Sequence, residues 1–277
     1  MVERNMNVLI CVSSMPHAQS TVMMGSLMAK LLGHPISLLK VITDEEEAET
    51  AASTLETVQK LIQLPVAETA VTLGAPAKEI LRKAESGRYD LIVVGAHAIR
   101  TLWDQFLQSV THKVANQATV SVLVARGEPK QLRHLLICTS GYVNSEIVVR
   151  NGAALARAAQ AKVTLLHVAE SMPAMYAGLD EMEETLPELL QTDTPLARHL
   201  KWASEYLLQT QVLAELKLRR GIVLDELLDE AQEGAYDLIV VGTRAEYNVL
   251  SSLLMGQVTP KIIDNAPCSV LIIRGDL

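Results

Sequence analysis

The sequence contains one series of apolar segments twice, in the same order along the chain. Each segment is short, rich in Val, Ile and Leu and nearly free of charged residues, which is typical of a strand buried on both faces of a sheet. The matched pairs are residues 8–13 with 135–140, 36–41 with 163–168, 89–95 with 236–242, and 121–126 with 269–274. Because chance hardly produces such an ordered series, the sequence predicts a duplicated domain.

Between the predicted strands lie stretches with the periodicity of amphipathic helices. They are residues 21–32, 77–84 and 109–116 in the first copy and 146–160, 223–231 and 257–265 in the second. Buried strands that alternate with helices imply right-handed crossovers and an open parallel sheet with helices on both faces. We therefore predict an α/β fold of two tandem Rossmann-like domains, at 1–127 and 131–277, joined by a linker at 128–130.

The second copy is longer than the first between its second and third matched segments. The spacing places about 20 extra residues there, and we locate this insertion near residues 169–195, a stretch rich in Met and acidic side chains. A loop of this length in a compact domain is often functional. The alternative is a solvated surface segment with a short helix.

Composition and charge exclude several classes of protein. The formal net charge of -8 argues against a nucleic-acid-binding surface. No apolar run reaches the roughly 18 residues of a membrane span, and the charged N-terminal segment runs into a strand too short for a signal peptide. The three cysteines (Cys11, Cys138 and Cys268) have neither the spacing of a metal site nor the even number of a disulfide framework. We expect a soluble cytoplasmic protein with no nucleic-acid or membrane partner and no bound metal.

Two motifs in each copy carry a resemblance to a known family. In the second copy they are residues 237–244, Asp-Leu-Ile-Val-Val-Gly-Thr-Arg, and 266–274, Ala-Pro-Cys-Ser-Val-Leu-Ile-Ile-Arg. Residues 90–97 and 120–126 match them in the first copy, and Gly-Ala-Pro-Ala at 74–77 is similar to the family's turn into its third helix. The chain resembles the universal stress protein family over essentially its whole length. This resemblance implies an adenine nucleotide alpha hydrolase-like fold and a role in the stress response.

Members of that family that bind ATP carry a motif of Gly, two residues, Gly, nine residues, Gly, and then Ser or Thr. Its glycines let the backbone approach the phosphates, whose charge is held by amide N–H groups and by the N-terminus of the next helix. The first copy keeps the spacing from Gly95, but Ala98 and Gln108 replace the later glycines before Ser109. The side chains of Ala98 and Gln108 intrude where phosphate oxygens would lie. Ser109 is also explained as the N-cap of a helix.

The second copy keeps one more glycine of this motif but changes the spacing. Gly242 is followed by Ala245, and Gly256 comes one residue later than the motif requires, with Gln257 in place of Ser or Thr. Gly256 permits a close approach to a ligand, and Arg244 is placed to meet a phosphate. The alternative is that Gly256 only turns the chain and that Arg244 is solvated.

The end of the first strand departs from the ATP-binding pattern in both copies. Ser13 and Ser140 stand where those relatives carry an Asp, so neither copy offers a carboxylate to a ribose or to Mg²⁺. We place the candidate ligand pocket in the second copy, at Ser140, Gly141, Val168, Gly242, Arg244, Gly256, Gln257 and Val258. The corresponding set in the first copy ranks below it and comprises Ser13, Ser14, Val41, Gly95, His97, Gln108 and Ser109.

No group of residues in the sequence has the pattern of a catalytic site. Paired carboxylates, a nucleophile elbow and a triad order are all missing, so we predict no catalytic residues. Cys11 and Cys138 occupy matching strand positions and are expected to be small buried core residues. His97 stands where the resembling family often has a His or Arg that faces the ligand, and the alternative is a polar loop residue.

The last strand of each copy, at 121–126 and 269–274, carries no charge before its final Arg. In the resembling family this strand lies at the edge of the sheet and pairs with the same strand of another domain. A bare apolar edge favours aggregation, so pairing is the simplest way to cover it. We predict that the two strands pair within one chain and make an internal pseudo-dimer, with a homodimer through the same strands as the alternative.

The leading functional hypothesis is a non-enzymatic stress-response protein that binds a small ligand or a partner, because the scaffold is intact while both phosphate motifs are eroded. The alternative is an adenine-nucleotide binder or slow ATPase that holds ATP in the second domain, around Gly242, Arg244 and Gly256. A third hypothesis is a pocket at the switch point of the sheet that takes an uncharged or differently charged small molecule.

Overall fold

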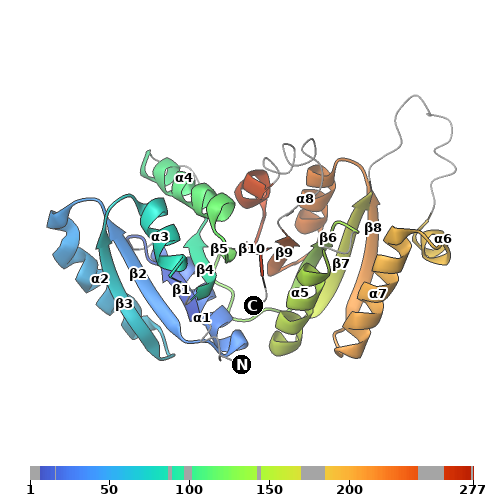
Figure 1. The fold of residues 1–277 in the computed structure, drawn as a ribbon, viewed down its shortest axis with the longest axis horizontal. Helices are drawn as coiled ribbons and strands as arrows, with labels where there is room; N and C mark the ends of the chain where they lie inside the picture. The colour runs from blue at the N-terminus through green and yellow to red at the C-terminus, as the bar shows by residue number, and fades with distance from the viewer. Residues whose placement is uncertain are drawn as a thin grey trace. The chain divides into compact units, whose positions relative to one another are not determined.

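The computed structural model describes residues 7–15, 17–86, 89–96, 102–141, 145–169, 185–242, 259–275 and 277. The chain divides into two compact units, one of Met1–Gln131 with Tyr247–Leu277 and the other of Leu132–Glu246. In both units the described strands alternate with helices and are mostly parallel (Figure 1). The predicted α/β class is therefore confirmed.

The first unit follows the expected alternation of strands and helices. Its elements are β1 (Asn7–Cys11), α1 (Ala18–Leu32), β2 (Ile36–Ile42), the 3-10 helix η1 (Glu45–Glu47), α2 (Ala48–Leu61), β3 (Val66–Leu73), α3 (Pro76–Ala84), β4 (Tyr89–Gly95), α4 (Leu102–Gln117), β5 (Ser121–Ala125) and β10 (Ser269–Ile273). Residues 259–265, ahead of β10, are also helical.

The sheet of the first unit has the strand order β3-β2-β1-β4-β5-β10. β1 is parallel to both β2 and β4, and Ile10 lies opposite Leu38 on one side and Val93 on the other. β10 runs antiparallel to β5, with Leu271 opposite Leu123. The direction of strand addition reverses between β1 and β4, which is the place where ligands of open α/β sheets bind.

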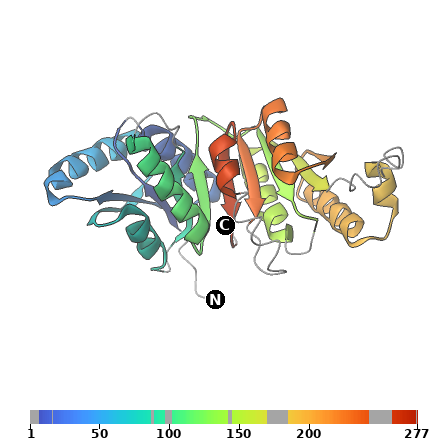
Figure 2. The ribbon, with the colours of Figure 1, turned by 90° about the horizontal axis from the view of Figure 1, so that it is seen from above.

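Both faces of the central strands are covered. Val8, Leu9 and Ile10 are consecutive residues whose side chains point to alternate faces, and all three have no exposed surface. Leu91, Ile92 and Val93 of β4 likewise have no exposed surface. Seen from above, helices lie on either side of the strands within each unit (Figure 2). This covering explains the nearly continuous apolar runs in the sequence.

The second unit repeats the pattern with an all-parallel sheet. Its elements are β6 (His134–Thr139), α5 (Glu146–Ala159), β7 (Lys162–Ala169), α6 (Leu186–Gln191), α7 (Pro195–Gln209), β8 (Ala214–Arg220), α8 (Val223–Glu233) and β9 (Leu238–Gly242). β6 lies between β7 and β9, with Ile137 opposite Leu165 and Val240, and β8 pairs with β7. This order corresponds to β4-β1-β2-β3 of the first unit, as a duplication requires.

A glycine brings the first helix of each copy close to the first strand. A Cβ atom added to Gly25 in α1 would lie 2.6 Å from Cδ1 of Ile10, and one added to Gly152 in α5 would lie 2.4 Å from Cδ1 of Ile137. Because real carbon atoms do not approach so closely, each helix packs on its strand at a distance that excludes any side chain at this position. The duplication thus preserved a packing contact as well as the strands.

The paired strands β5 and β10 are joined by reciprocal polar contacts at their ends. The backbone N–H of Arg126 donates to Oγ of Ser269 at 3.0 Å, and that of Arg274 donates to Oγ of Ser121 at 3.1 Å. The Arg126 guanidinium donates to the carbonyl oxygen of Ile263 at 2.8 Å, and the Arg274 guanidinium donates to carbonyl oxygens at the end of α4. Together with the antiparallel ladder, these contacts join β5 to β10.

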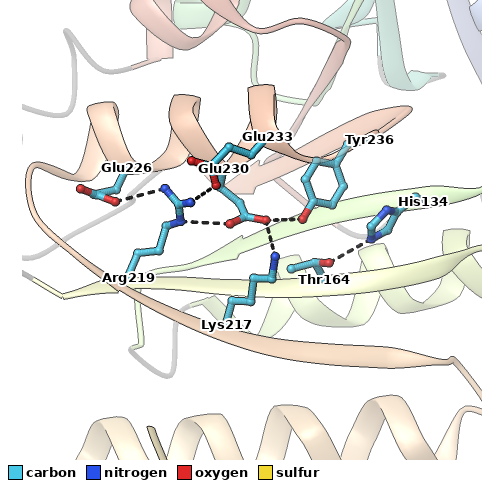
Figure 3. A network of polar contacts seen from close by, with 8 residues as sticks. All are labelled: His134, Thr164, Lys217, Arg219, Glu226, Glu230, Glu233 and Tyr236. Carbon is cyan, nitrogen blue, oxygen red and sulfur yellow. Dashed lines mark hydrogen bonds and ion pairs between the residues drawn. The ribbon is translucent and has the colours of Figure 1, made fainter. Parts of the chain in front are cut away.

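A buried carboxylate organises the polar interior between β8 and α8 (Figure 3). The Glu230 side chain is 2% exposed, and its Oε1 accepts from Nζ of Lys217 at 2.9 Å and from the hydroxyl of Tyr236 at 2.5 Å. Its Oε2 accepts from Nε of Arg219 at 3.0 Å, and Arg219 also contacts Glu226 and Glu233. Burial raises the pKa of Glu230, but these hydrogen bonds and charges outweigh burial and hold its pKa below the usual value.

Several elements differ from the sequence prediction. The strands β3 and β8 and the helices α2 and α7 were not expected, although each completes the alternation. The predicted helix at 109–116 is part of α4, which begins at Leu102, so Ser109 lies inside the helix and its interpretation as an N-cap is wrong. The predicted insertion near 169–195 falls largely on residues 170–184, outside the described part of the chain, and remains a prediction.

Candidate functional site

The first unit contains a cavity of about 500 Å³ at the switch point of its sheet. The carboxyl ends of β1, β2 and β4 form its floor, through Cys11 to Ser14, Leu39 to Val41, and Val94 with Gly95. Side chains from α2, α3 and α4 form its sides, among them Ala51, Ile80 and Val110. The topology therefore places this cavity where open α/β sheets bind ligands.

The walls of this cavity are mostly apolar. Val12, Leu39, Ala51, Ile80 and Val94 are all buried members of the core that also line it. Hydroxyl groups interrupt this surface, namely those of Ser13, Ser14, Thr43, Thr50, Thr54 and Thr111. Apolar walls with a few polar groups are the usual lining of a small-molecule site.

Acidic residues gather at the rim of the cavity. The sequence Asp44-Glu45-Glu46-Glu47 follows β2, and Asp44, Glu46 and Glu47 are lining residues. Asp44 is the N-cap of η1, since its carboxylate accepts a hydrogen bond of 3.0 Å from the backbone N–H of Glu46. This cap and the positive end of the helix turn explain why the acidic run is stable at this position.

Lys40 of β2 brings a cation to the acidic rim. Its Nζ donates to the carbonyl oxygen of Ser13 at 3.3 Å. Burial lowers the pKa of the Lys40 ammonium, and the charge of Glu47 opposes this effect in part. The cavity thus presents both charges at its mouth, with the carboxylates in the majority among the described lining residues.

The residues predicted for the first copy divide into lining and non-lining groups. Ser13, Ser14, Val41 and Gly95 all line the cavity, as the switch-point topology requires. The carbonyl oxygen of Gly95 accepts a hydrogen bond of 2.9 Å from the Thr111 hydroxyl, which ties α4 to the end of β4.

Gln108 and Ser109 are engaged elsewhere. Nε2 of Gln108 donates to Oδ1 of Asp264 at 2.6 Å, and Asp264 also lies 2.7 Å from Nε2 of His112. The Ser109 hydroxyl donates to the carbonyl oxygen of Phe106 within the same helix. Neither residue lines the cavity. His97, the remaining residue of the first set, lies outside the described part of the chain.

In the second unit the corresponding space beside the end of β6 holds packed side chains. Gly141 has φ 78, and a Cβ atom on it would lie 2.5 Å from Cδ1 of Leu196 and 3.0 Å from Cε1 of His167. Ser140 is exposed and Val168 is half-buried. A Cβ atom on Gly242 would lie 2.6 Å from Cγ2 of Val148. The other predicted residues of this set lie outside the described part of the chain: Arg244, Gly256, Gln257 and Val258.

Buried polar groups accompany this packing. Oγ1 of Thr139 lies 2.7 Å from Nε2 of His199 and 2.8 Å from Oγ of Ser145. Nδ1 of His167 is 3.0 Å from the carbonyl oxygen of Thr139. Burial lowers the pKa of both His167 and His199, so both rings are neutral near pH 7. Their buried ring nitrogens require hydrogen-bond partners, which Thr139 supplies to both.

The sequence did not reveal the cavity residues that α2 and α3 supply, and it did not place Cys11 in the cavity lining. Thr50, Ala51 and Thr54 were overlooked because the helix that carries them was not expected. Cys11 is half-buried and lines the cavity, whereas a core position was predicted. Burial raises the pKa of its thiol, so Cys11 is protonated at neutral pH.

Two negative findings concern the described residues. No described helix is long and apolar enough to cross a membrane. Within the same part of the chain, no group of three or more His, Cys, Asp or Glu side chains is arranged to hold a metal ion.

A cavity at the switch point of a doubly wound parallel sheet is the arrangement of α/β domains that bind small ligands. The model of the universal stress protein family matches this chain twice, at residues 5–126 and 131–274. The chain belongs to the universal stress protein family, with two family domains in tandem, as the resemblance of its motifs implied.

Individual curated relatives match part of this chain. The universal stress protein YxiE of Bacillus subtilis is 45% identical over 60 residues, which is 22% of this chain and 40% of that protein. The universal stress protein MJ0531 of Methanocaldococcus jannaschii is 25% identical over 54% of this chain and 87% of its own length. The match thus spans less than half of the Bacillus protein.

A solved structure matches the tandem chain as a whole. It is a universal stress protein from Archaeoglobus fulgidus, and the superposition covers 99% of this chain and 97% of that one with a TM-score of 0.69. The two sequences are 16% identical, so this likeness concerns the fold.

Proposed function

We propose that this protein is a non-enzymatic ligand-binding module of the stress response, and that its first domain binds a small neutral or positively charged molecule. The single observation that carries this proposal is the cavity at the switch point between β1 and β4. Its volume of about 500 Å³ falls within the range of roughly 300–1,000 Å³ that is usual for small-molecule sites.

The charges at the rim support this choice of ligand. Asp44, Glu46 and Glu47 face a ligand that enters, and Lys40 offsets part of their charge. A triphosphate would be repelled by these carboxylates, since like charges at short range cost energy even in a solvent-exposed setting. At the described positions Gln108 and Ser109 of the phosphate motif, the side chains bond to other protein groups and are not directed to a ligand in the cavity.

Cavity-blocking variants test the proposal. Ala51 is buried in the wall and Ala52 is exposed on the same helix, so Ala51→Phe fills the cavity and Ala52→Phe is the matched control. The protein as purified is examined by native mass spectrometry for a bound small molecule, and added compounds are screened by thermal shift. We expect a ligand that Ala52→Phe retains and Ala51→Phe loses.

Nucleotide binding is the outcome that would contradict this proposal. Calorimetry with ATP and Mg²⁺ that gave a dissociation constant below about 10 μM, or -6.8 kcal/mol, would favour the alternative. If Ala51→Phe left that affinity unchanged, the nucleotide would belong to the second domain, as the hypothesis around Gly242, Arg244 and Gly256 states. If Ala51→Phe abolished it, the first domain would be the ATP site.

We also propose that the two family domains associate inside one chain through β5 and β10, in the cytoplasm, in place of a homodimer made through these strands. The antiparallel register and the reciprocal Ser–Arg contacts support this proposal. Since β5 is then covered, we expect a monomer of 30.2 kDa by light scattering. A stable dimer that persists at low concentration would point to pairing between chains.

A further inference from the structure

Lys40 is a half-buried lysine at the edge of an apolar cavity. Its ammonium has one hydrogen bond among the described residues, to the carbonyl oxygen of Ser13, and at 3.3 Å this bond is long. No described carboxylate forms an ion pair with it, and Glu47 acts on it only through its charge. A cation in this setting has lost much of its hydration and has gained little in return.

Two other partly buried lysines show what a satisfied site looks like. Lys83 is bonded to Glu68, and Lys217 is bonded to Glu230 at 2.9 Å. The pKa of each is raised, since a carboxylate in direct contact favours the ammonium. The pKa of Lys40 is lowered instead, first by burial and against the opposing charge of Glu47. Lys40 therefore presents more free amine near neutral pH than an ordinary lysine does.

The surroundings of Lys40 suit a reaction of that amine with a carbonyl group. The apolar walls admit a hydrophobic carbonyl compound, and the hydroxyls of Ser14, Thr43 and Thr54 and the carboxylate of Glu47 are present at the same cavity to exchange protons. Cys11, another nucleophile that lines the cavity, does not compete, because burial raises the pKa of its thiol.

We propose that Lys40 captures small apolar aldehydes as an imine. This inference rests on the proposed function, because the aldehyde reaches Lys40 through the same cavity. The neutral Nζ attacks the carbonyl carbon, and the former carbonyl oxygen takes up a proton to give a carbinolamine. The hydroxyl of the carbinolamine then leaves as water while nitrogen releases its remaining N–H proton, and a C=N bond joins Lys40 to the ligand. One aldehyde gives one imine and one water, with no oxidant or reductant.

The second copy of the domain supplies an internal comparison. The matched segments 36–41 and 163–168 place His167 at the position of Lys40. Nδ1 of His167 lies 3.0 Å from the carbonyl oxygen of Thr139, much as Nζ of Lys40 meets that of Ser13 at the end of the corresponding strand. An imidazole ring cannot form an imine, so the capture belongs to the first domain alone.

Reductive trapping tests the capture directly. The full chain is incubated at pH 7.5 with limiting benzaldehyde and sodium cyanoborohydride, and benzylated lysines are located by peptide mass spectrometry. Lys60 and Lys78 are exposed lysines of the same unit and serve as references. We expect Lys40 to be labelled at least about fivefold more than either, because a lowered pKa leaves more free amine at this pH.

Matched variants separate the amine from its charge and from the cavity. Lys40→Arg keeps the cation and Lys40→His installs the residue of the second copy, and both should lose the label at position 40 without gaining it elsewhere. Ala51→Phe blocks the cavity and should reduce labelling of Lys40 at least about fivefold, to the level expected of an unassisted amine, while leaving Lys60 unchanged. Labelling that follows exposure, with Lys40 below Lys60 and Lys78, would overturn the inference.

A ligand without the carbonyl group distinguishes this inference from the proposed function. Benzyl alcohol has nearly the shape of benzaldehyde but cannot form an imine, and its binding is measured by thermal shift on the wild type and on Ala51→Phe. Binding of benzyl alcohol without selective labelling of Lys40 rejects the capture and leaves the ligand-binding function standing. Selective labelling without benzyl alcohol binding supports the capture and counts against a non-covalent site. Neither result rejects both.

Discussion

At the residue scale, a buried polar network surrounds Glu230 in the second unit. Its carboxylate is almost completely buried and is held by Lys217, Arg219 and Tyr236 (Figure 3). The first unit has a related arrangement with the charges exchanged, because Glu68 on the strand meets Lys83 on the helix and the hydroxyl of Tyr89. Both domains thus anchor the helix before the third matched strand through a tyrosine and an ion pair.

Removing the charge of Glu230 should destabilise the fold. Glu230→Gln leaves Lys217 and Arg219 without their buried partner, and we expect a loss of about 2–4 kcal/mol in the free energy of unfolding, measured with urea at pH 7. Glu233→Gln removes a partner of Arg219 that is 66% exposed and should cost less than about 1 kcal/mol. Equal effects of the two changes would contradict the central role of Glu230.

The stabilisation that Glu230 provides should also depend on pH. The pKa of Glu230 is lowered in the folded state, so its contribution is present above the pKa of an unfolded glutamate, about 4.3, and is lost as the pH falls through the folded value. We therefore expect the stability difference between wild type and Glu230→Gln to shrink as the pH is lowered from 7 to below about 4. A difference that stays constant over this range would mean that the carboxylate charge contributes nothing.

The buried histidines predict a second dependence on pH. Burial lowers the pKa of His199, so at this position the unfolded chain binds a proton more readily than the folded chain does. The free energy of unfolding therefore rises with pH as the histidine loses its proton. Between pH 7.5 and 5.5 we expect the wild type to lose stability with a slope of at most about 1.4 kcal/mol per pH unit for each such histidine. His199→Gln should flatten the slope of stability against pH, measured by urea unfolding at each pH.

At the scale of elements, the closest contact in each copy is that between the first helix and the first strand. Gly25→Ala places a Cβ atom against Cδ1 of Ile10, which is buried and has nowhere to move, so overpacking by about 1–3 kcal/mol opposes the helix propensity that alanine gains. Ile10→Val removes that Cδ1 atom. In a double-mutant cycle measured by urea unfolding, we expect a favourable coupling of about 1 kcal/mol. Additive effects would show that the contact is relaxed elsewhere.

The elements that were not expected are instructive. β3 alternates between half-buried and exposed positions along its whole length, as Val66-Ala67-Glu68-Thr69 illustrates, and β8 carries Lys217, Arg219 and Arg220. β3 and β8 are edge strands, because each lies at the end of the strand order of its unit. One side of an edge strand is solvated, so these two strands lack the continuous apolar run by which the central strands were recognised. The helices α2 and α7, which precede these two strands, were not predicted either. For this reason the cavity residues Ala51 and Thr54 of α2 were not identified from the sequence.

At the scale of the whole molecule, the end of the chain completes the first unit. β10 pairs with β5, and Arg274 donates to carbonyl oxygens of Ala115 and Ala118 at the end of α4. These contacts satisfy the last carbonyls of that helix, which have no partners within it. The C-terminal segment therefore stabilises the part of the chain that contains the cavity.

A chain that ends at residue 258 tests this dependence. Without β10, the outer side of β5 has no partner, so we expect amide exchange at Val122 to Val124 to become at least about tenfold faster, measured by hydrogen–deuterium exchange. The amides of β7, which lies between β6 and β8, serve as the internal control. Unchanged protection of β5 would show that another surface covers it.

The sequence by itself determined the duplication, the parallel α/β class and the family, because buried central strands produce continuous apolar runs that can be recognised along the sequence. It also placed Ser13, Ser14, Val41 and Gly95 correctly at a switch point, since the ends of parallel strands converge there. Only the tertiary structure decided which side chains meet at the strand ends of each copy. Ala51 and Ile80 line the cavity beside the end of β1, whereas among the described residues Leu196 and His167 pack against Gly141 beside the end of β6. Such a difference depends on side chains from separate helices meeting in space, and spacing along the chain does not encode it.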